Sequence, residues 1–274
     1  PDALPEIIDQ QIIDDVVIAD PGASLPQAQN IIRQCEEVGC VVHLLTDLFQ
    51  AAVSRPHVES FGQMSFLTFS ATPYAPAALA AKRILDIAGS ICLMAVFSPF
   101  FIALPILIRL TSPGPVFFRQ TRCGLNGRRF TMFKFRSMVQ DAEARLHEVA
   151  AQNELDGPDF KIARDPRITP IGRFMRRYSL DELPQLWNVL RGDMSLVGPR
   201  PPIPAETALY ERWQRRRLSM RPGLTGLGQI RGRHRLSFEQ WMACDLEYID
   251  TWTLWLDIRI LLRTIPAVLK GGGV

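Results

Sequence analysis

Short apolar runs and a helical apolar spacing alternate near the start of the chain. Residues 12–19 read as a short buried strand, and residues 41–49 as a second strand and its exit. Residues 24–39 between them have the spacing of a helix with a serine cap and a glycine stop. This β-α-β order predicts part of an α/β, Rossmann-like domain over residues 1–70. Because no G-x-G-x-x-G sequence follows the first strand, the pattern favours a structural or regulatory module over a dinucleotide site. Residues 71–81, rich in proline and alanine, predict a linker.

The next segment is strongly apolar, with 22 uncharged residues from Ile87 to Ile108. About 20 apolar residues are enough to cross a bilayer as a helix. Ser98 and Pro99 near its middle predict a break, because proline removes a backbone hydrogen bond and the serine hydroxyl can sharpen the bend. Basic residues stand on both sides, and such residues prefer the cytoplasmic face; they are Lys82, Arg83, Arg109, Arg119 and Arg122. The pattern favours a re-entrant membrane helix over residues 82–110, with a kinked full span or a buried core helix as alternatives.

Beyond this segment, apolar and basic residues alternate in a way that indicates a β-hairpin. Residues 115–120 (PVFFRQ) and 129–135 (RFTMFKF) read as strands joined through GLNG. Residues 206–220 read as a basic helix, and residues 237–270 as a helical C-terminal segment. Within the basic helix, the run Arg215–Arg217 indicates a membrane-facing surface, since anionic headgroups attract basic side chains by about 1 kcal/mol each.

Composition supports a folded chain with an anionic partner. Of the 274 residues, 47% are hydrophobic and 22% are charged, which excludes a disordered chain. Residues 1–80 hold ten acidic and two basic side chains, a balance of −8, so the net charge of +3 leaves +11 on the remainder. A basic part of this kind indicates nucleic acid, a phosphorylated substrate or anionic lipid as partner. The five cysteines include no CxxC pair and predict free thiols, and His147 and His234 stand in no triad or metal spacing.

Two adjacent carboxylates, Asp181 and Glu182, stand in the sequence SLDELPQLWNVL. Ser179-x-x-Glu182 fits a capping box, which satisfies backbone N–H groups at the start of a helix. The alternative interpretation is that the same two carboxylates carry out the chemistry of the protein. The two interpretations are compatible. The helix begins either at Leu180 or at Pro184, and in the second case the carboxylates precede it.

Two arginines stand in short motifs beside turns: Arg136 in KFRSM and Arg200 in GPRP. Arginine binds phosphate oxygens in a bidentate way, so both are candidate phosphate ligands. The alternative for each is a surface position or an ordinary salt bridge.

Three long motifs occur together in this chain: SPFFIALPILIRLTSPGPVFFRQTRCGLNGRRFTMFKFRSM, RRYSLDELPQLWNVLRGDMSLVGPRP and RPGLTGLGQIRGR. From about Lys82 to about Lys270 the chain resembles the bacterial sugar transferases, the monotopic polyprenyl-phosphate phosphoglycosyl transferases. The resemblance implies an α+β membrane-associated catalytic domain over residues 111–270 with a re-entrant membrane helix, preceded by part of an α/β Rossmann-like domain. Large members of the family also carry N-terminal transmembrane helices, so the chain fits a fragment of such a member.

The resemblance also implies an activity, the transfer of a sugar 1-phosphate from a UDP-sugar to undecaprenyl phosphate with release of UMP. This reaction starts surface-glycan assembly at the cytoplasmic face of the bacterial inner membrane. By resemblance, Asp181 is the nucleophile that carries the phosphosugar, Glu182 is its partner in holding Mg²⁺, and Arg176 contacts phosphate. The lipid bilayer is a further partner, and the Rossmann-like piece is a candidate for homodimer formation. The alternative function is a catalytically silent membrane-associated scaffold; nucleic acid is not expected, because the chain has a long apolar segment and no recognition-helix motif.

Overall fold

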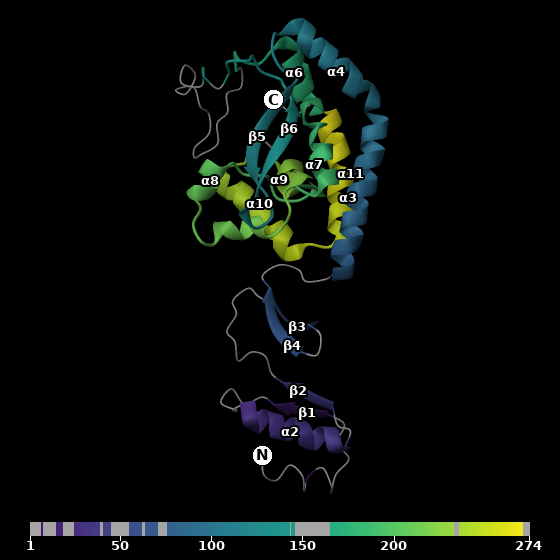
Figure 1. The fold of residues 1–274 in the computed structure, drawn as a ribbon, viewed down its shortest axis with the longest axis vertical. Helices are drawn as coiled ribbons and strands as arrows, with labels where there is room; N and C mark the ends of the chain where they lie inside the picture. Colours follow the sequence, from purple (N-terminus) through teal and green to yellow (C-terminus); the bar gives the residue numbers. More distant parts are fainter. Residues whose placement is uncertain are drawn as a thin grey trace. The chain divides into compact units, whose positions relative to one another are not determined.

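The computed structural model describes residues 7, 15–18, 25–38, 41–44, 55–61, 64–70, 76–142, 144–145, 165–232 and 236–270. The chain divides into two compact units, Pro1–Ala71 and Thr72–Val274, and each has its own helices and strands (Figure 1). His147, His234 and Cys40 lie outside the described residues.

The described part of the first unit contains the predicted β-α-β order. β1 (Asp15–Ile18) and β2 (Val41–Leu44) pair in parallel, with α2 (Leu25–Val38) between them in the chain. The unit also contains an antiparallel hairpin of β3 (Arg55–Phe61) and β4 (Met64–Ser70), which the apolar pattern did not predict. One parallel strand pair does not define a Rossmann fold, so the described residues establish a mixed helix-and-strand unit.

The second unit starts with two helices that meet at a sharp bend. α3 (Pro76–Val96) and α4 (Ser98–Thr111) are inclined by 60°, with Phe97 at the break. The break lies where Ser98 and Pro99 predicted it, because a proline in the first turn of a helix sacrifices no intrahelical hydrogen bond. The predicted linker is helical from Pro76 onward, since proline suits a helix start and the alanines that follow are strong helix formers.

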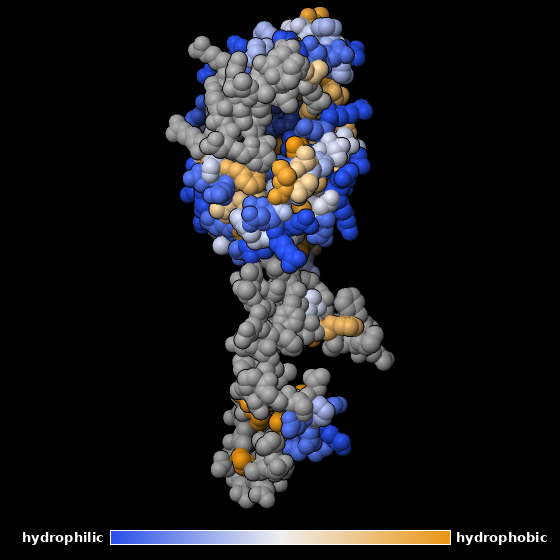
Figure 2. All heavy atoms as spheres, turned by 90° about the vertical axis from the view of Figure 1, so that its left-hand side faces the viewer, coloured by the Kyte–Doolittle hydropathy of each residue, from blue (hydrophilic) through white to orange (hydrophobic). Residues whose placement is uncertain are grey.

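α4 packs on the protein along one face only. Leu104 and Ile108, one turn apart, are 2% and 1% exposed, whereas Ile102, Ile106 and Leu110 are 69%, 56% and 78% exposed. This distribution contradicts the alternative of a buried core helix. Among the described residues, no single helix is long and apolar enough to cross a membrane, but α3 and α4 taken together meet both criteria. Further hydrophobic residues are exposed across the face of the second unit that Figure 2 shows.

The basic residues near the start of α3 are held by contacts within the protein. Lys82 is 6% exposed, and its Nζ lies 2.5 Å from Oδ2 of Asp257. Arg83 donates hydrogen bonds of 2.6 and 2.8 Å to the last carbonyl oxygens of α7 (Gln185–Arg191). Both side chains turn inward because the start of α3 packs against other elements of the unit. The position of this basic flank on the cytoplasmic side of a membrane stays a prediction.

The predicted hairpin is confirmed. β5 (Phe117–Cys123) and β6 (Arg129–Phe135) pair in antiparallel fashion through the GLNG turn. Asn126 in this turn has φ 54°, a left-handed value that asparagine tolerates better than most residues. The register places Phe118 opposite Lys134, which fixes how the hairpin presents its side chains to the rest of the unit.

The remaining described elements are mostly short helices around one parallel strand pair. They are α6 (Pro170–Arg177), α7, β7 (Ser195–Val197), α8 (Pro204–Ala208), β8 (Gly223–Thr225), α9 (Leu227–Arg231), α10 (Phe238–Thr251) and α11 (Leu254–Leu269), with 3₁₀ turns at Leu180–Glu182 and Gln214–Ser219. β7 and β8 form the parallel pair, and α11 lies beside α3 (Figure 1). The main apolar core joins α7, β7, α10 and α11 through buried residues that include Leu186, Val189, Leu196, Ile249 and Ile260.

A second apolar cluster joins α4 to the turn that carries the two carboxylates. Leu104 and Ile108 of α4 pack together with Phe135, Met175 and Leu180. Leu180 immediately precedes Asp181 in the chain, so its burial fixes the position of the carboxylate turn relative to α4.

Residues 206–220 do not form the single basic helix that their composition predicted. α8 and a separate 3₁₀ turn replace it. Arg217 is 2% exposed and binds Asp245 at 2.6 Å and Glu206 at 3.3 Å, so the membrane-facing prediction is wrong for this residue. The physical reason is that two buried carboxylates require a cation, and this requirement turns the guanidinium inward.

The C-terminal segment is helical as predicted, with a break at Trp252 and Thr253 between α10 and α11. α10 starts with a capping box, in which Ser237 and Gln240 each accept the backbone N–H of the other. The described cysteines are free, as predicted; they are Cys35, Cys92, Cys123 and Cys244.

Candidate active site

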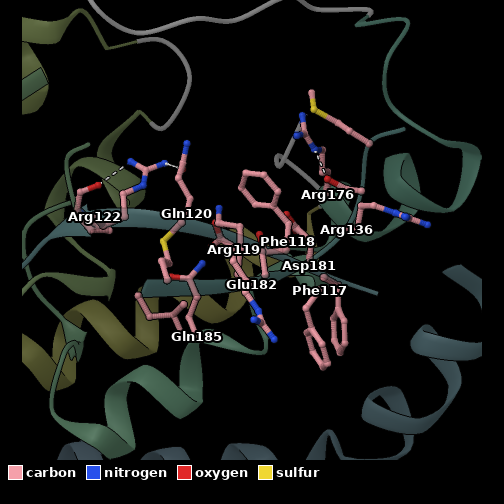
Figure 3. Close-up of a pocket in the computed structure, with 18 of the residues that line it drawn as sticks. Phe117, Phe118, Arg119, Gln120, Arg122, Arg136, Arg176, Asp181, Glu182 and Gln185 are labelled. Carbon is pink, nitrogen blue, oxygen red and sulfur yellow. Dashed lines mark hydrogen bonds and ion pairs between the residues drawn. The ribbon is translucent and has the colours of Figure 1, made fainter. Parts of the chain in front are cut away.

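A cleft of about 1430 Å³ opens in the second unit. Its walls come from β5, β6, the end of α6, the loop Gly198–Pro201, and from β8, α9 and α10. In Figure 3 the two carboxylates lie among the lining residues, with Arg136 and Arg176 toward one end and Gln120 and Arg122 toward the other. The cleft brings together all five side chains predicted to act at the site: Asp181, Glu182, Arg136, Arg176 and Arg200.

The carboxylates lie on a 3₁₀ turn that precedes α7. Ser179 has φ 55° and makes no side-chain capping hydrogen bond, so the predicted capping box is wrong. Ser179, two residues after the end of α6, has a left-handed conformation. Its backbone carbonyl oxygen, not its hydroxyl, accepts the hydrogen bond from the Glu182 N–H at 3.2 Å. α7 begins at Gln185, with Pro184 as the residue before it. The second alternative for the helix start is thus correct to within one residue, and the carboxylates precede the helix.

Asp181 is a buried carboxylate, 7% exposed, with both positively and negatively charged side chains nearby. Burial raises its pKa from 3.8 to about 6, because a charged group loses solvation by water there. The positive charges of Lys134 and Arg176 lower the pKa, and the negative charge of Glu182 raises it. The carboxylate is therefore mostly ionised at neutral pH, while its ionisation remains costly to the fold.

Lys134 is a member of the site that the sequence did not single out. Its Nζ lies 2.7 Å from Oε1 of Glu182, and both side chains are about three-quarters buried. The sequence does contain a signal for it, because Lys134 stands two residues before Arg136, and alternate residues of a strand point to the same side. Lys134 offsets part of the negative charge of the carboxylate pair.

The Asp181→Asn variant is expected to be more stable than the wild-type protein at pH 8 in EDTA. A raised pKa means that Asp181 contributes stability that is complete below about pH 4 and is lost as the pH rises through about 6. The difference between 3.8 and about 6 corresponds to at most about 3 kcal/mol in the free energy of unfolding. Thermal unfolding of both proteins from pH 4 to pH 8 measures it. A difference in Tm that does not grow with pH would contradict the assigned charge balance.

Arg176 and Arg136 reach the cleft in different ways. Arg176, in the last turn of α6, donates from Nε to the hydroxyl of Ser137 at 2.9 Å and acts electrostatically on Asp181. Arg136 is 6% exposed and donates to the carbonyl oxygens of Ser112 and Pro113 at 2.7 and 2.9 Å. Arg136 thus holds the turn that follows α4, and neither of its sequence-based alternatives, a surface position or a salt bridge, describes it. Its role as a phosphate ligand stays a prediction.

Arg200 lies in the loop after β7, between two prolines. Its backbone N–H donates to Oδ2 of Asp245 at 3.3 Å, and its guanidinium carbon lies 6.0 Å from the ring centroid of Trp241. Asp245 and Trp241 belong to α10 and also line the cleft. Neither was predicted as a site residue, because an acidic and an aromatic residue on a helix read as ordinary surface and core positions.

The two carboxylates fit Mg²⁺ only together with a phosphate ligand. Among the described residues, no group of three or more His, Cys, Asp or Glu side chains could hold a metal ion. Mg²⁺ is commonly bound by one or two carboxylates, with substrate phosphates and waters completing its octahedron. Asp181 and Glu182 supply such a pair at the wall of an open cleft, which leaves room for a phosphate group.

Residues 77–271 match the family model described as bacterial sugar transferase. The chain is 43% identical over 249 residues to "Galactosyl transferase CpsE" of Streptococcus agalactiae, a match that covers 90% of this chain and 55% of the relative. It is 44% identical over 198 residues to the "UDP-glucose:undecaprenyl-phosphate glucose-1-phosphate transferase" of Caulobacter vibrioides, with 69% of each chain covered. It is 37% identical over 265 residues to the "Undecaprenyl-phosphate glucose phosphotransferase" of Komagataeibacter xylinus, with 92% of this chain and 48% of the relative covered. The chain spans about half the length of the Streptococcus and Komagataeibacter relatives.

Proposed function

Because the chain belongs to the bacterial sugar transferase family, we propose that it transfers a sugar 1-phosphate from a UDP-sugar to undecaprenyl phosphate and releases UMP. The observation that carries the proposal is the buried Asp181 carboxylate, with its pKa raised to about 6, beside Glu182 and Lys134 in a cleft that Arg176 also lines. The relatives are named for glucose and for galactose transfer, so the sugar is left open. The reaction starts the assembly of a surface glycan.

In the first step, an oxygen of Asp181 attacks the β-phosphorus of the UDP-sugar. A new O–P bond forms, and the bond from that phosphorus to the oxygen that bridges it to the α-phosphate breaks. UMP leaves with the electron pair, and the sugar phosphate stays on Asp181. Burial removes water from the attacking carboxylate, while Lys134 and Arg176 keep it ionised and attract the anionic diphosphate.

In the second step, a phosphate oxygen of undecaprenyl phosphate attacks the same phosphorus. The bond to Asp181 breaks, and its carboxylate is restored. Arg176 and Arg200 line the cleft in which these phosphates are placed and offer positive charge to them. A magnesium ion held by Asp181 and Glu182 would neutralise charge on the phosphate oxygens and on the departing UMP.

The bent pair of α3 and α4 suits an acceptor that carries a long lipid. We assign it to the cytoplasmic leaflet of the bacterial inner membrane as a re-entrant pair, because α4 exposes apolar side chains along most of its surface. Pro105, Ile106 and Arg109 of α4 line the same cleft as Asp181. Because the apolar helix α4 reaches the cleft, it brings the phosphate of the lipid to the Asp181 carboxylate at the level of the lipid headgroups. Homodimer formation through the first unit stays a prediction.

Lys134→Met is expected to reduce UMP release about tenfold at pH 6.5 and by much less at pH 8.5. Removing the positive charge raises the pKa of Asp181, so less of the nucleophile is ionised near neutral pH. A nearby opposite charge typically shifts the pKa of a carboxyl group by about 1–3, which is enough for a tenfold change in the ionised fraction at pH 6.5. Initial rates at both pH values measure the effect. Lys134→Arg, which keeps the charge, is the matched control and should stay near the wild-type rate. Equal losses at the two pH values would contradict the electrostatic role.

The test of the proposed function is UMP release in the presence of Mg²⁺ and undecaprenyl phosphate. UDP-glucose, UDP-galactose and their N-acetylated counterparts are offered separately to the purified chain in phospholipid nanodiscs. Release of UMP with one of them, together with a sugar diphospholipid product, supports the proposal. No release with any of them from a folded chain favours the catalytically silent scaffold.

A further inference from the structure

Arg200 receives two contacts from one face of α10. The backbone N–H of Arg200 donates to Asp245, and the guanidinium lies over the ring of Trp241. Trp241 and Asp245 are four residues apart on a helix, so their side chains point to the same side. Arg200 itself stands between Pro199 and Pro201, whose fixed φ angles limit the movement of the loop.

The ring of Trp241 packs against α9 at Gly228. A Cβ added to Gly228 would lie 2.3 Å from two carbons of this ring, so the indole packs directly on the helix backbone and only glycine leaves room for it. The capping box at the start of α10 fixes the helix just before Trp241. The indole therefore has no space to move toward Gly228.

Asp245 is fixed in its turn by Arg217. It is 1% exposed, and the Oδ2 atom that accepts the Arg200 N–H also lies 2.6 Å from Nη2 of Arg217. Arg217 is bound on its other side by Glu206 and by the hydroxyl of Tyr210. A buried chain of charges thus ends at the backbone of a cleft-lining arginine.

We propose that Trp241 and Asp245 are positioning residues that hold the guanidinium of Arg200 in place for the diphosphate of the nucleotide sugar. The proposal rests on the proposed function, because that function brings a diphosphate into the cleft. A free arginine side chain samples many rotamers, and ordering it on binding costs affinity. The indole face attracts a guanidinium, and the hydrogen bond to Asp245 fixes the backbone from which the side chain extends. Together they place the cation before the substrate arrives.

The experiment is a double-mutant cycle on UDP binding, measured by isothermal titration of the full chain at fixed Mg²⁺. Trp241→Leu is expected to weaken UDP binding about fivefold to tenfold, the size of a cation–aromatic contact that is partly exposed to water. Trp241→Phe keeps an aromatic face and should stay within about twofold of wild type. In an Arg200→Gln background, Trp241→Leu should change binding by less than about 1.5-fold, because Trp241 acts through Arg200. Trp255→Leu, on the exposed side of α11 outside the cleft, is the matched control and should have no effect.

Two outcomes overturn the proposal. If Trp241→Leu weakens UDP binding equally in the wild-type and Arg200→Gln backgrounds, Trp241 contacts the nucleotide itself. If Trp241→Leu leaves UDP binding unchanged while Arg200 is present, the contact between Trp241 and Arg200 does not position the guanidinium. Asp245→Asn leaves Arg217 short of a buried partner and destabilises the fold. The role of Asp245 is therefore tested by UDP binding to the folded fraction of this variant, which should be weaker than in the wild type, and equal binding would overturn that role. Absence of UDP binding to the folded wild-type chain would instead overturn the proposed function.

Discussion

Asp181→Asn is expected to reduce UMP release by about 10³-fold or more. Asparagine has the shape of aspartate, but its amide is a poor nucleophile, and the loss of a nucleophile removes most of the catalysis that a site provides. The variant should also release no UMP in the absence of undecaprenyl phosphate, a condition in which the wild-type chain performs the first step once. Mass spectrometry of the wild-type chain should then show a sugar phosphate on Asp181, which the variant lacks.

The stability of the same variant makes the loss of activity interpretable. Because Asp181→Asn removes a carboxylate that is costly to bury, the folded state should be at least as stable as that of the wild type at pH 8. Asp250→Asn is the matched control, since Asp250 is an exposed carboxylate outside the cleft that pairs with Arg216; it should keep wild-type activity. UMP release above about a tenth of the wild-type rate in a folded Asp181→Asn chain would rule out Asp181 as the nucleophile.

Local chemistry explains why parts of the fold could be predicted from the sequence. The GLNG turn between two alternating segments specifies the hairpin of β5 and β6, because asparagine and glycine accept the left-handed conformation that the turn needs. Ser98 and Pro99 locate the bend between α3 and α4 for an equally local reason. The position of Asp181 before α7 follows from Pro184, which suits the first residues of a helix.

Long-range tertiary contacts explain the features of the structure that the sequence did not predict. The basic flank predicts the cytoplasmic side for Lys82, and the arginine run predicts a membrane-facing surface for Arg217. Neither pattern indicates that the side chain is buried against a carboxylate elsewhere in the chain. No local pattern pairs Lys82 with Asp257, or Arg217 with Asp245. The sequence at Ser179 fits the four-residue capping pattern, yet Ser179 has a positive φ and makes no side-chain cap, and the adjacent Leu180 packs into the cluster with α4. The Arg200 contacts with α10 depend on the same kind of long-range packing.

The Lys82–Asp257 pair is the polar centre of the second unit. Lys82 of α3 also donates to the carbonyl oxygen of Val197 in β7 at 3.0 Å. Asp257 of α11 accepts from the hydroxyl of Tyr248 at 2.7 Å and from Nε1 of Trp252 at 3.3 Å. The pair therefore joins α3, β7, α10 and α11 in one hydrogen-bonded group directly before the loop that carries Arg200.

Lys82→Met is expected to lower the free energy of unfolding by about 3–5 kcal/mol, because it leaves the Asp257 carboxylate buried without its cation. Chemical denaturation measures the loss. Glu247→Gln is the matched control, since it breaks the Arg231–Glu247 pair, whose side chains are 46% and 45% exposed and screened by water; it should cost at most about 1 kcal/mol. Combining Lys82→Met with Asp257→Leu should recover part of the loss, because one buried carboxylate, that of Asp86, is then left without its cation where Lys82→Met alone leaves two. A Lys82→Met chain within about 1 kcal/mol of wild type would mean that Tyr248 and Trp252 alone satisfy Asp257, and that α3 is held by apolar packing instead.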